Sequence, residues 1–408
     1  MTAVRSDTRP APARYRVGYG TVAVAYLALQ AFVTVPSPLY PLYAQRDHLS
    51  PFTLTVAYGA YAIGVAVSLV LAGHLSDTYG RRPLLLAALG LDTVSALVLL
   101  VWPSLPGLFV ARVVCGLAVG VTGSTATAYL TELFAAHRPA HQLHRAQLLA
   151  TATALGGLGA GGLVAGVLAV VAARPLALPY AVSLGVFVLC AAALLLVPET
   201  RRRARPLPPY RPQRLALPPG AAGRFVAALA GVATQFAVFG LFVALAGTVL
   251  AALHHRSPVL SGATLGLVFA AGVACAVVTA SLAYRAVVPL AVVLLLAGLA
   301  LLVVAVWLPH PSIAAFLAGG VLVGAGGAAL FRASLGVVVA VSPTERRAGT
   351  LAAFFLAGYL GMSVPVVGIG TALLWVPVRV ALLGFAAVAA VAALLVWPVL
   401  ARADGPRP

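Results

Sequence analysis

The chain has 408 residues, of which 62% are hydrophobic and only 8% are charged. Soluble domains carry about 25% charged residues, so this chain has too few polar side chains to cover a water-exposed surface. The formal net charge of +18 would fit a nucleic-acid-binding protein if the chain were soluble. In a lipid-embedded chain, basic residues gather in cytoplasmic loops instead. The composition therefore predicts a protein of the lipid bilayer and no nucleic-acid partner.

Twelve apolar segments are long enough to cross a bilayer, which takes about 20 residues of helix. Six precede a stretch at 198–223 that is rich in proline and arginine, and six follow it. We predict an all-α polytopic membrane protein of two six-helix bundles, 1–197 and 224–408, joined by a solvated linker. The predicted helices span 20–43, 53–74, 84–102, 107–131, 146–171, 177–197, 225–252, 260–283, 287–308, 313–341, 348–373 and 378–399.

The arginines alternate between the loops as the positive-inside rule requires. With the N-terminus in the cytoplasm, 20 of the 26 basic residues lie in cytoplasmic segments and four in outer loops. The other two, Arg112 and Arg332, fall within helices. This distribution predicts a multi-pass protein of the cell (cytoplasmic, inner) membrane with both termini cytoplasmic. The polar, basic N-terminal tail has no evident cleavage site, so we expect an uncleaved first helix.

The loop between the second and third helices carries the most specific motif. Residues 73–82 read GHLSDTYGRR. Glycine at position 80 suits a left-handed turn, and Asp77 is placed to accept backbone N–H groups at the start of the third helix. The paired arginines are expected to contact carboxylates on neighbouring helix ends. Glu132, at the end of the fourth helix, is the candidate partner.

This loop resembles the signature of the major facilitator superfamily, G-x-L-x-D-R-x-G-R-R. It departs from the signature at Thr78, where the family usually has a basic residue. In that family the loop holds helix ends together in one access state. The resemblance therefore implies a conformational latch made of Gly73, Asp77, Gly80, Arg81, Arg82 and Glu132. The alternative is an ordinary helix cap with solvated arginines.

Two further helices resemble those of the same family. Arg112 lies about six residues inside the fourth helix, where a charge needs a wet cavity or a partner, or else extends to the interface. The fifth helix resembles the G-x-x-x-G-P-x-x-G-G motif of proton-coupled antiporters, with Leu158 in place of the proline. Pro365 is expected to form a kink or gate in the eleventh helix. The glycines of the fifth helix expected to serve packing or gating are Gly157, Gly161 and Gly162.

Asp92 is the one acidic residue expected in the middle of a helix. A lone carboxyl inside a membrane helix is by default a functional candidate, and here proton coupling is the role we expect. The alternative is a structural carboxyl that stays protonated or bonds a neighbouring hydroxyl. The family resemblance favours this alternative, because the third helix of the family is usually peripheral.

The resemblance also implies a central cavity lined by helices 1, 4, 7 and 10. Amides there would bind a substrate or bond neighbouring helices, and aromatic rings would contact a substrate or pack in the core. Two inward-facing arginines without a cavity acid would favour anionic or zwitterionic substrates. The residues expected at the cavity are Tyr26, Gln30, Arg112, Gln235, Phe239, Arg332 and Tyr359.

The sequence holds no pattern typical of an enzyme, a metal site or a nucleotide-binding loop. We therefore predict no cofactor and no direct use of ATP. The expected function is export of a small organic molecule by alternating access, coupled to proton influx, by a protein that works as a monomer like most of the family it resembles. Proton-coupled import of a metabolite in the same fold is the first alternative. A membrane sensor or scaffold without transport is the second.

Overall fold

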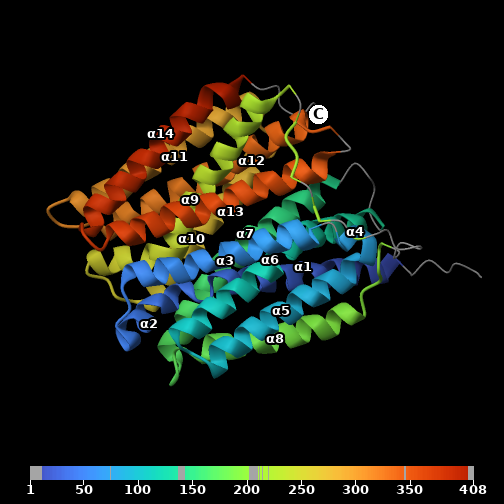
Figure 1. Cartoon of the computed structure of the whole chain (residues 1–408), viewed down its shortest axis with the longest axis horizontal. Helices are drawn as coiled ribbons and strands as arrows, with labels where there is room; N and C mark the ends of the chain where they lie inside the picture. Colours follow the sequence, from blue (N-terminus) through green and yellow to red (C-terminus); the bar gives the residue numbers. More distant parts are fainter. Residues whose placement is uncertain are drawn as a thin grey trace, which may run out of the picture.

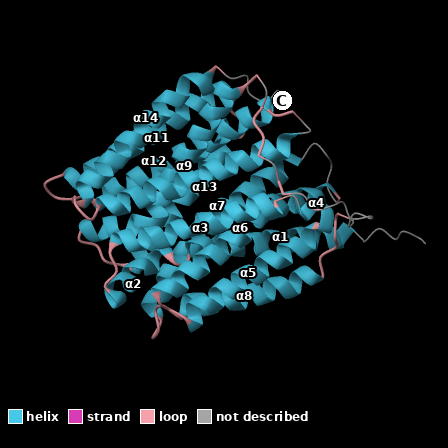
Figure 2. Cartoon of the chain, in the orientation of Figure 1, coloured by secondary structure: helices cyan, strands magenta, loops and turns pink. Residues whose placement is uncertain are grey.

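The computed structural model describes residues 12–73, 75–136, 143–201, 210, 212–213, 215–218, 220–343 and 346–402. Residues 1–11 of the predicted N-terminal tail and the linker arginines at 202, 203, 205, 211 and 214 lie outside these ranges, whereas residues 12–19, predicted to precede the first helix, form the start of a helix. Regular structure within them is helical throughout (Figure 2). Twelve helical segments in the described part of the chain are long and apolar enough to cross a membrane, so the predicted fold class is confirmed.

The helices follow the predicted segments to within a few residues at most ends. Their bounds are α1 (Pro12–Thr34), η1 (Ser37–Leu39), α2 (Tyr40–Asp47), α3 (Pro51–Ala72), α4 (Leu75–Tyr79), α5 (Arg81–Val101), α6 (Leu105–Ala135), α7 (Leu143–Val171), α8 (Leu178–Leu195), α9 (Ala222–Ala252), α10 (Pro258–Thr279), α11 (Tyr284–Trp307), α12 (Ile313–Val341), α13 (Arg347–Ala372) and α14 (Val378–Ala401).

The first span was predicted as one helix over 20–43, and this was wrong at its end. α1 stops at Thr34, and a 3₁₀ turn, η1, separates it from α2. Pro36 and Pro38 explain the break, because proline lacks a backbone N–H and clashes with the preceding helical turn. Elsewhere, serine side chains define helix starts, as where Ser50 accepts a hydrogen bond from the backbone of Thr53 at the beginning of α3.

The helices form two halves, α1–α8 and α9–α14, which lie on opposite sides of the molecule in Figure 1. Two helix pairs make the main contacts between the halves, α3 with α13 and α7 with α10. α5 and α8 form one outer edge, and α11 and α14 the other (Figure 1). We call the end of the bundle that holds α2 the α2 end, and the opposite end, where α8 ends and α9 begins, the linker end.

The two halves pack closely against each other at the α2 end. A Cβ atom added at Gly59 of α3 would lie 3.1 Å from Cγ2 of Val367 on α13. A Cβ atom at Gly247 of α9 would lie 2.6 Å from Cγ of Pro41. Close contacts of this kind need residues without side chains, so the structure shows the halves closed against each other at the α2 end.

At the linker end the described linker residues touch both halves. The backbone N–H of Gln213 donates to the carbonyl of Val70 over 2.8 Å, and the N–H of Ala216 donates to the carbonyl of Gly349 over 3.4 Å. The first acceptor lies near the end of α3 and the second near the start of α13. The linker thereby satisfies a carbonyl that the end of α3 would otherwise leave without a partner.

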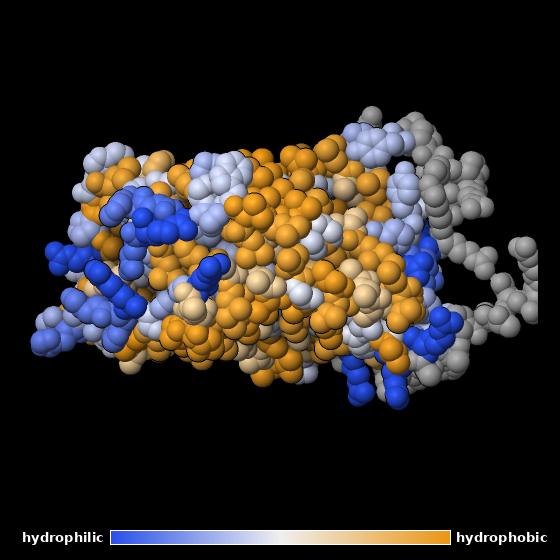
Figure 3. Space-filling view, turned by 90° about the horizontal axis from the view of Figure 1, so that it is seen from below, coloured by the Kyte–Doolittle hydropathy of each residue, from blue (hydrophilic) through white to orange (hydrophobic). Residues whose placement is uncertain are grey.

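The surface agrees with a bilayer as solvent. Figure 3, which views the α5–α8 edge, shows a hydrophobic band between two hydrophilic ends. Large apolar side chains are exposed on the outer helices, for example Leu189 on α8, which is 71% exposed. Water would not tolerate a continuous apolar surface of this extent, whereas lipid favours it.

Candidate functional site

Arg112 is the most deeply buried arginine in the described part of the first half, with 1% of its surface exposed. Its Nη1 donates to the carbonyl of Val33 on α1 over 2.9 Å. Its Cζ lies 4.7 Å from the ring centroid of Tyr61 and 5.4 Å from that of Tyr58, two residues of α3. Cation–π contacts in a desolvated site stabilise by about 2 kcal/mol. Nε and Nη2 have no hydrogen-bond partner among the described residues.

The approach of α3 to α6 makes this geometry possible. A Cβ atom on Gly64 of α3 would overlap the backbone of α6, and one on Gly116 of α6 would overlap the backbone of α3. Tyr58 and Tyr61 are spaced i, i+3, so both rings point from the same face of α3 toward Arg112. The glycine pair thus brings two aromatic rings within reach of the guanidinium.

Asp92 of α5 is fully buried near Arg112. Neither carboxylate oxygen accepts a geometrically well-formed hydrogen bond from a described residue, and the Cys115 thiol lies near enough to act as a weak donor. Its electrostatic neighbours are the Cys115 thiol and the Arg112 guanidinium, which are three residues apart on one face of α6. Ser95, one turn further along α5, holds the two helices together by donating to the carbonyl of Ala111 over 2.8 Å. A buried carboxyl group and a buried guanidinium therefore lie near each other in the first half. We call Arg112 and its neighbours Tyr58, Tyr61, Asp92 and Cys115 the Arg112 cluster.

A layer of aromatic rings connects this cluster with the second half. The ring of Tyr61 meets that of Tyr359 on α13 edge to face, with centroids 6.0 Å apart. Tyr359 in turn meets Phe236 of α9 at 5.2 Å. Tyr26 of α1 lies beside Tyr359 and beside Thr127 of α6. Of the residues predicted at a cavity, the structure thus brings Tyr26, Arg112 and Tyr359 together.

The other predicted cavity residues lie elsewhere on the inner helices. The stem of Gln30 is close to Gly157 of α7, and that of Gln235 is close to Gly327 of α12. The Oε1 atoms of both amides are buried without a hydrogen-bond partner in the described part of the chain. Phe239 packs against the ring of Phe269 at 5.0 Å. Substrate contact by these three residues stays a prediction.

Arg332 corrects the expectation of a second cavity cation. Its guanidinium donates to the carbonyls of Thr279, at the last residue of α10, and of Ala280. The last carbonyls of a helix lack partners within the helix and carry a partial negative charge, which a cation stabilises. Arg332 therefore caps α10 and does not join Arg112. The predicted pair of inward-facing arginines is not formed, and the preference for anionic substrates loses this support.

The predicted contact between Arg81 and Glu132 is present. Arg81 Nη2 lies 3.0 Å from Glu132 Oε1 and 2.7 Å from Asp77 Oδ1. Its Nη1 donates to the Ser76 hydroxyl over 2.7 Å. The Arg81 side chain is 8% exposed, so two carboxylates and a hydroxyl satisfy a largely buried guanidinium. The latch role of this contact stays a prediction.

Glu199, which follows α8, makes the cap that we had assigned to Asp77. Its two carboxylate oxygens accept the backbone N–H groups of Arg81 and Arg82, each over 3.0 Å. Asp77 lies in the short helix α4 and faces the Arg81 side chain instead. Gly80, with φ of 105°, turns the chain between α4 and α5. Because Gly80 has no side chain, Glu199 can approach the N-terminus of α5.

Arg82 was expected to pair with a carboxylate, and its side chain donates to carbonyls instead. Its Nη1 contacts the carbonyls of Leu195 and Val197, at 3.1 and 3.2 Å. These carbonyls lie at the last residue of α8 and two residues after it, so Arg82 and Glu199 together join the end of α8 to α5. The remaining predicted latch residue, Gly73, is the C-cap of α3.

The glycines of α7 fall on two different faces. A Cβ atom at Gly157 or Gly161 would strike the backbone of α1 within the first half, whereas one at Gly162 would lie 2.6 Å from Leu265 of α10 in the second half. α7 runs unbroken across Leu158, in keeping with the missing proline. Pro365 lies inside α13, which also continues as one helix. The gating roles of these residues are not tested by their positions.

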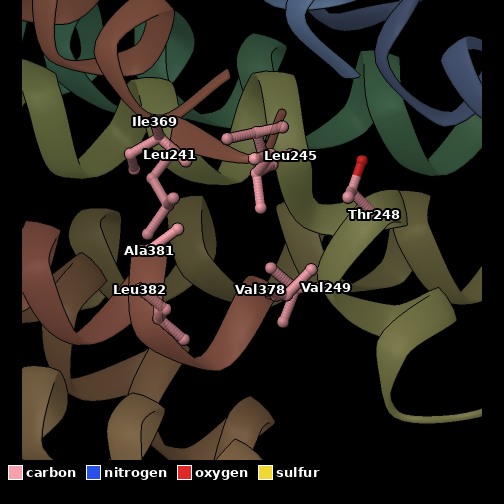
Figure 4. Close-up of a pocket in the computed structure, with 9 residues that line it drawn as sticks. Leu241, Leu245, Thr248, Val249, Ile369, Val378, Ala381 and Leu382 are labelled. Carbon is pink, nitrogen blue, oxygen red and sulfur yellow. The ribbon is translucent and has the colours of Figure 1, made fainter. Parts of the chain in front are cut away.

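A small apolar crevice lies apart from the Arg112 cluster, between α9, α13 and α14 (Figure 4). Its lining is aliphatic except for the Thr248 hydroxyl, as the close-up shows. Such a crevice offers no group that could carry charge or a proton. In the described ranges, histidine, cysteine and acidic residues form no cluster of three or more that could hold a metal ion.

Comparison with known proteins decides the family. A family model described as "Major Facilitator Superfamily" matches residues 22–309, most of the chain. The chain belongs to the Major Facilitator Superfamily. The nucleoside transporter NupG, in a crystal structure, has a similar fold, with a TM-score of 0.69 over 94% of this chain and 99% of NupG at 11% sequence identity. At this identity the likeness concerns the fold alone.

Two curated relatives from the superfamily's bacterial members match shorter segments. The chain is 36% identical over 84 residues to the arabinose-proton symporter of Bacillus subtilis (strain 168), which is 21% of this chain and 18% of the symporter. It is 28% identical over 108 residues to the inner membrane transport protein YnfM of Escherichia coli (strain K12), 26% of either chain. The matches therefore span about a quarter or less of these relatives.

Sequence reasoning missed several residues of the cluster. Tyr58 and Tyr61 carried a usable signal, since two tyrosines spaced i, i+3 in an apolar helix share one face. Cys115 lies three residues after Arg112, and the same rule would have grouped the two. The contact between Glu199 and the start of α5 joins positions 118 residues apart, so no local pattern predicts it.

Proposed function

We propose that the chain is a secondary active transporter of the cytoplasmic membrane that exports a small organic molecule in exchange for protons. The observation that supports this most is the buried pair of Asp92 and Arg112, both with unused hydrogen-bonding atoms. Charged groups inside a membrane protein are costly, and they are typical of ion pathways and substrate sites. Membership of the Major Facilitator Superfamily supports the alternating-access mechanism.

In the proposed mechanism Asp92 carries the proton. Binding of a proton removes the negative charge beside Arg112 and so changes which partners the guanidinium favours. Arg112 already contacts α1 through Val33 and α3 through Tyr58 and Tyr61. A change of its partners would therefore act on α1 and α3, and α3 is one of the two helices of the first half that contact the second half most.

Orientation follows from the arginines. We propose that the linker end faces the cytoplasm, because the basic residues gather in the segments of that end. The latch around Arg81 and Glu132 then lies on the cytoplasmic side. It joins α4, α5, α6 and the segment after α8, all within the first half, and we propose that it keeps this half rigid during the transport cycle.

The direction of transport can be measured in membrane vesicles. Compounds that stabilise the purified protein against heat are first selected, since binding to the native state raises the unfolding temperature. In everted vesicles acidified by respiration, an exporter that exchanges substrate for protons should accumulate the compound and dissipate the pH gradient. Vesicles without the protein provide the baseline.

Proton-coupled import is the second candidate, favoured by the similarity to a protein named as an arabinose-proton symporter. An importer of this kind would accumulate the compound in right-side-out vesicles that are alkaline inside, and not in everted ones. That result would replace the proposal of export. Absence of flux in both orientations, with a bound compound and a folded protein, would contradict transport altogether.

A further inference from the structure

A hollow of about 280 Å³ opens at the α2 end, on the edge of the molecule formed by α5 and α8. Its walls come from α2, from the end of α5, and from the connections between α5 and α6 and between α7 and α8. The lining residues are Leu42, Arg46, Leu99, Leu100, Pro103, Arg174, Pro175, Leu176 and Ala177. The hollow shares none of these residues with the Arg112 cluster.

The walls are apolar except for two arginines with different surroundings. Arg46 is fixed and neutralised, since its Nε and Nη2 contact the Asp47 carboxylate at 2.7 and 2.6 Å and Nη2 also donates to the carbonyl of Pro103. Arg174 is exposed, and its side chain makes no hydrogen bond or ion pair with another described residue. The hollow therefore combines an aliphatic interior with one uncompensated cation.

The hollow lies at the level expected for the lipid headgroups. It lies next to the end of α5, where Val101 is 82% exposed and Trp102 is 49% exposed. Tryptophan is enriched at the level of the lipid headgroups, because its ring is apolar and its N–H is polar. The Arg174 guanidinium is thus placed near the headgroups, while Leu99 and Leu100 lie on the hydrocarbon side of Trp102.

We propose that this hollow binds an anionic phospholipid of the leaflet at the α2 end, with its phosphate at Arg174 and part of an acyl chain against Leu100 and Leu176. A soluble anion would leave the aliphatic walls uncovered, and a neutral apolar molecule would leave the cation without a partner. An anionic amphiphile satisfies both. The proposal does not depend on what the protein transports.

The test uses the full chain purified in a neutral detergent, with lipid binding followed by native mass spectrometry and by the unfolding temperature. Phosphatidylglycerol should bind and stabilise the protein, phosphatidylcholine with the same acyl chains should bind more weakly, and glycerol 3-phosphate should have no effect. Arg174→Gln should weaken phosphatidylglycerol binding about fivefold, the effect of one arginine near a lipid surface. Leu176→Trp, which fills the hollow without a change of charge, should weaken it as well.

Arg256→Gln is the matched control, because Arg256 is also exposed at the α2 end but lies in the connection between α9 and α10. It should leave phosphatidylglycerol binding unchanged. Equal binding by wild type and Arg174→Gln would overturn the proposal, as would an equal loss in Arg256→Gln. Stabilisation by glycerol 3-phosphate alone would also overturn it in favour of a site for a soluble anion.

Discussion

Replacement of Asp92 by asparagine is expected to abolish transport driven by a pH gradient while exchange of substrate across the membrane continues. Asparagine has nearly the same shape as aspartic acid but cannot bind and release a proton near neutrality. Asp92 is fully buried beside Arg112 and Cys115, and asparagine fills the same volume, so the substitution leaves packing intact. Uphill flux should fall to the level of vesicles without protein.

The measurement compares uphill flux with counterflow in the same proteoliposomes. Counterflow needs only binding and alternating access, so a misfolded variant would lose both activities and a variant defective in coupling would lose one. Asp47→Asn is the control, because Asp47 forms its ion pair with the neighbouring Arg46 at the α2 end, away from Arg112. Uphill flux at the wild-type rate in Asp92→Asn would remove Asp92 from the mechanism.

Replacement of Gly161 by alanine is expected to destabilise the protein by about 3 kcal/mol or more, at the upper end of the cost of overpacking. The added Cβ would overlap the carbonyl of Ala31 and lie 2.7 Å from its Cα, and these are backbone atoms of α1 that no side-chain rotation can move. α1 and α7 would have to separate. We expect a lower yield of folded protein and a lower unfolding temperature in detergent.

Gly156→Ala provides the comparison for this substitution. Gly156 lies on the same helix, and a Cβ atom there would meet nothing within 4 Å. Alanine also has the higher helix propensity, so this variant should be as stable as wild type or slightly more so. Equal unfolding temperatures for the two variants would show that the contact between α1 and α7 is looser than the structure has it.

The sequence predicts the fold of this chain well because lipid imposes a simple rule. A segment that crosses the bilayer must be helical, about 20 residues long and apolar, and these properties are local. The break after Thr34 was missed although Pro36 and Pro38 mark it, because the apolar run continues through both prolines. A hydropathy pattern records the length of an apolar run and does not record a break in the helix within it.

The candidate site was only partly predictable from the sequence. A charged residue within an apolar run can be recognised locally, but the residue that it contacts lies on another helix. Arg112 and Asp92 are recognisable as charges inside apolar runs. Arg332 fits the same description, yet it contacts the end of α10, and this depends on how α10 and α12 pack. The cap made by Glu199 depends in the same way on the contact between α8 and α5. Contacts between helices thus decide which buried charge belongs to a site.

Rocking of the two halves is tested most directly by a reversible covalent link across the α2 end. Cysteines at Gly59 and Val367 would lie close enough for a disulfide between α3 and α13, since the Cβ position of Gly59 is 3.1 Å from Val367 Cγ2. The native cysteines Cys115, Cys190 and Cys275 are first replaced. Cysteines at Gly18 and Val197 give a control link between α1 and the segment after α8 within the first half, where the Cβ position of Gly18 lies 2.9 Å from Val197 Cγ1 and meets no backbone atom.

Oxidation of the α3–α13 pair should stop flux in proteoliposomes, and reduction should restore it, because alternating access requires the halves to part at the α2 end. Oxidation of the control pair should leave flux unchanged. Flux that continues at the unlinked rate, with the α3–α13 disulfide shown to be fully formed, would contradict alternating access between these two halves.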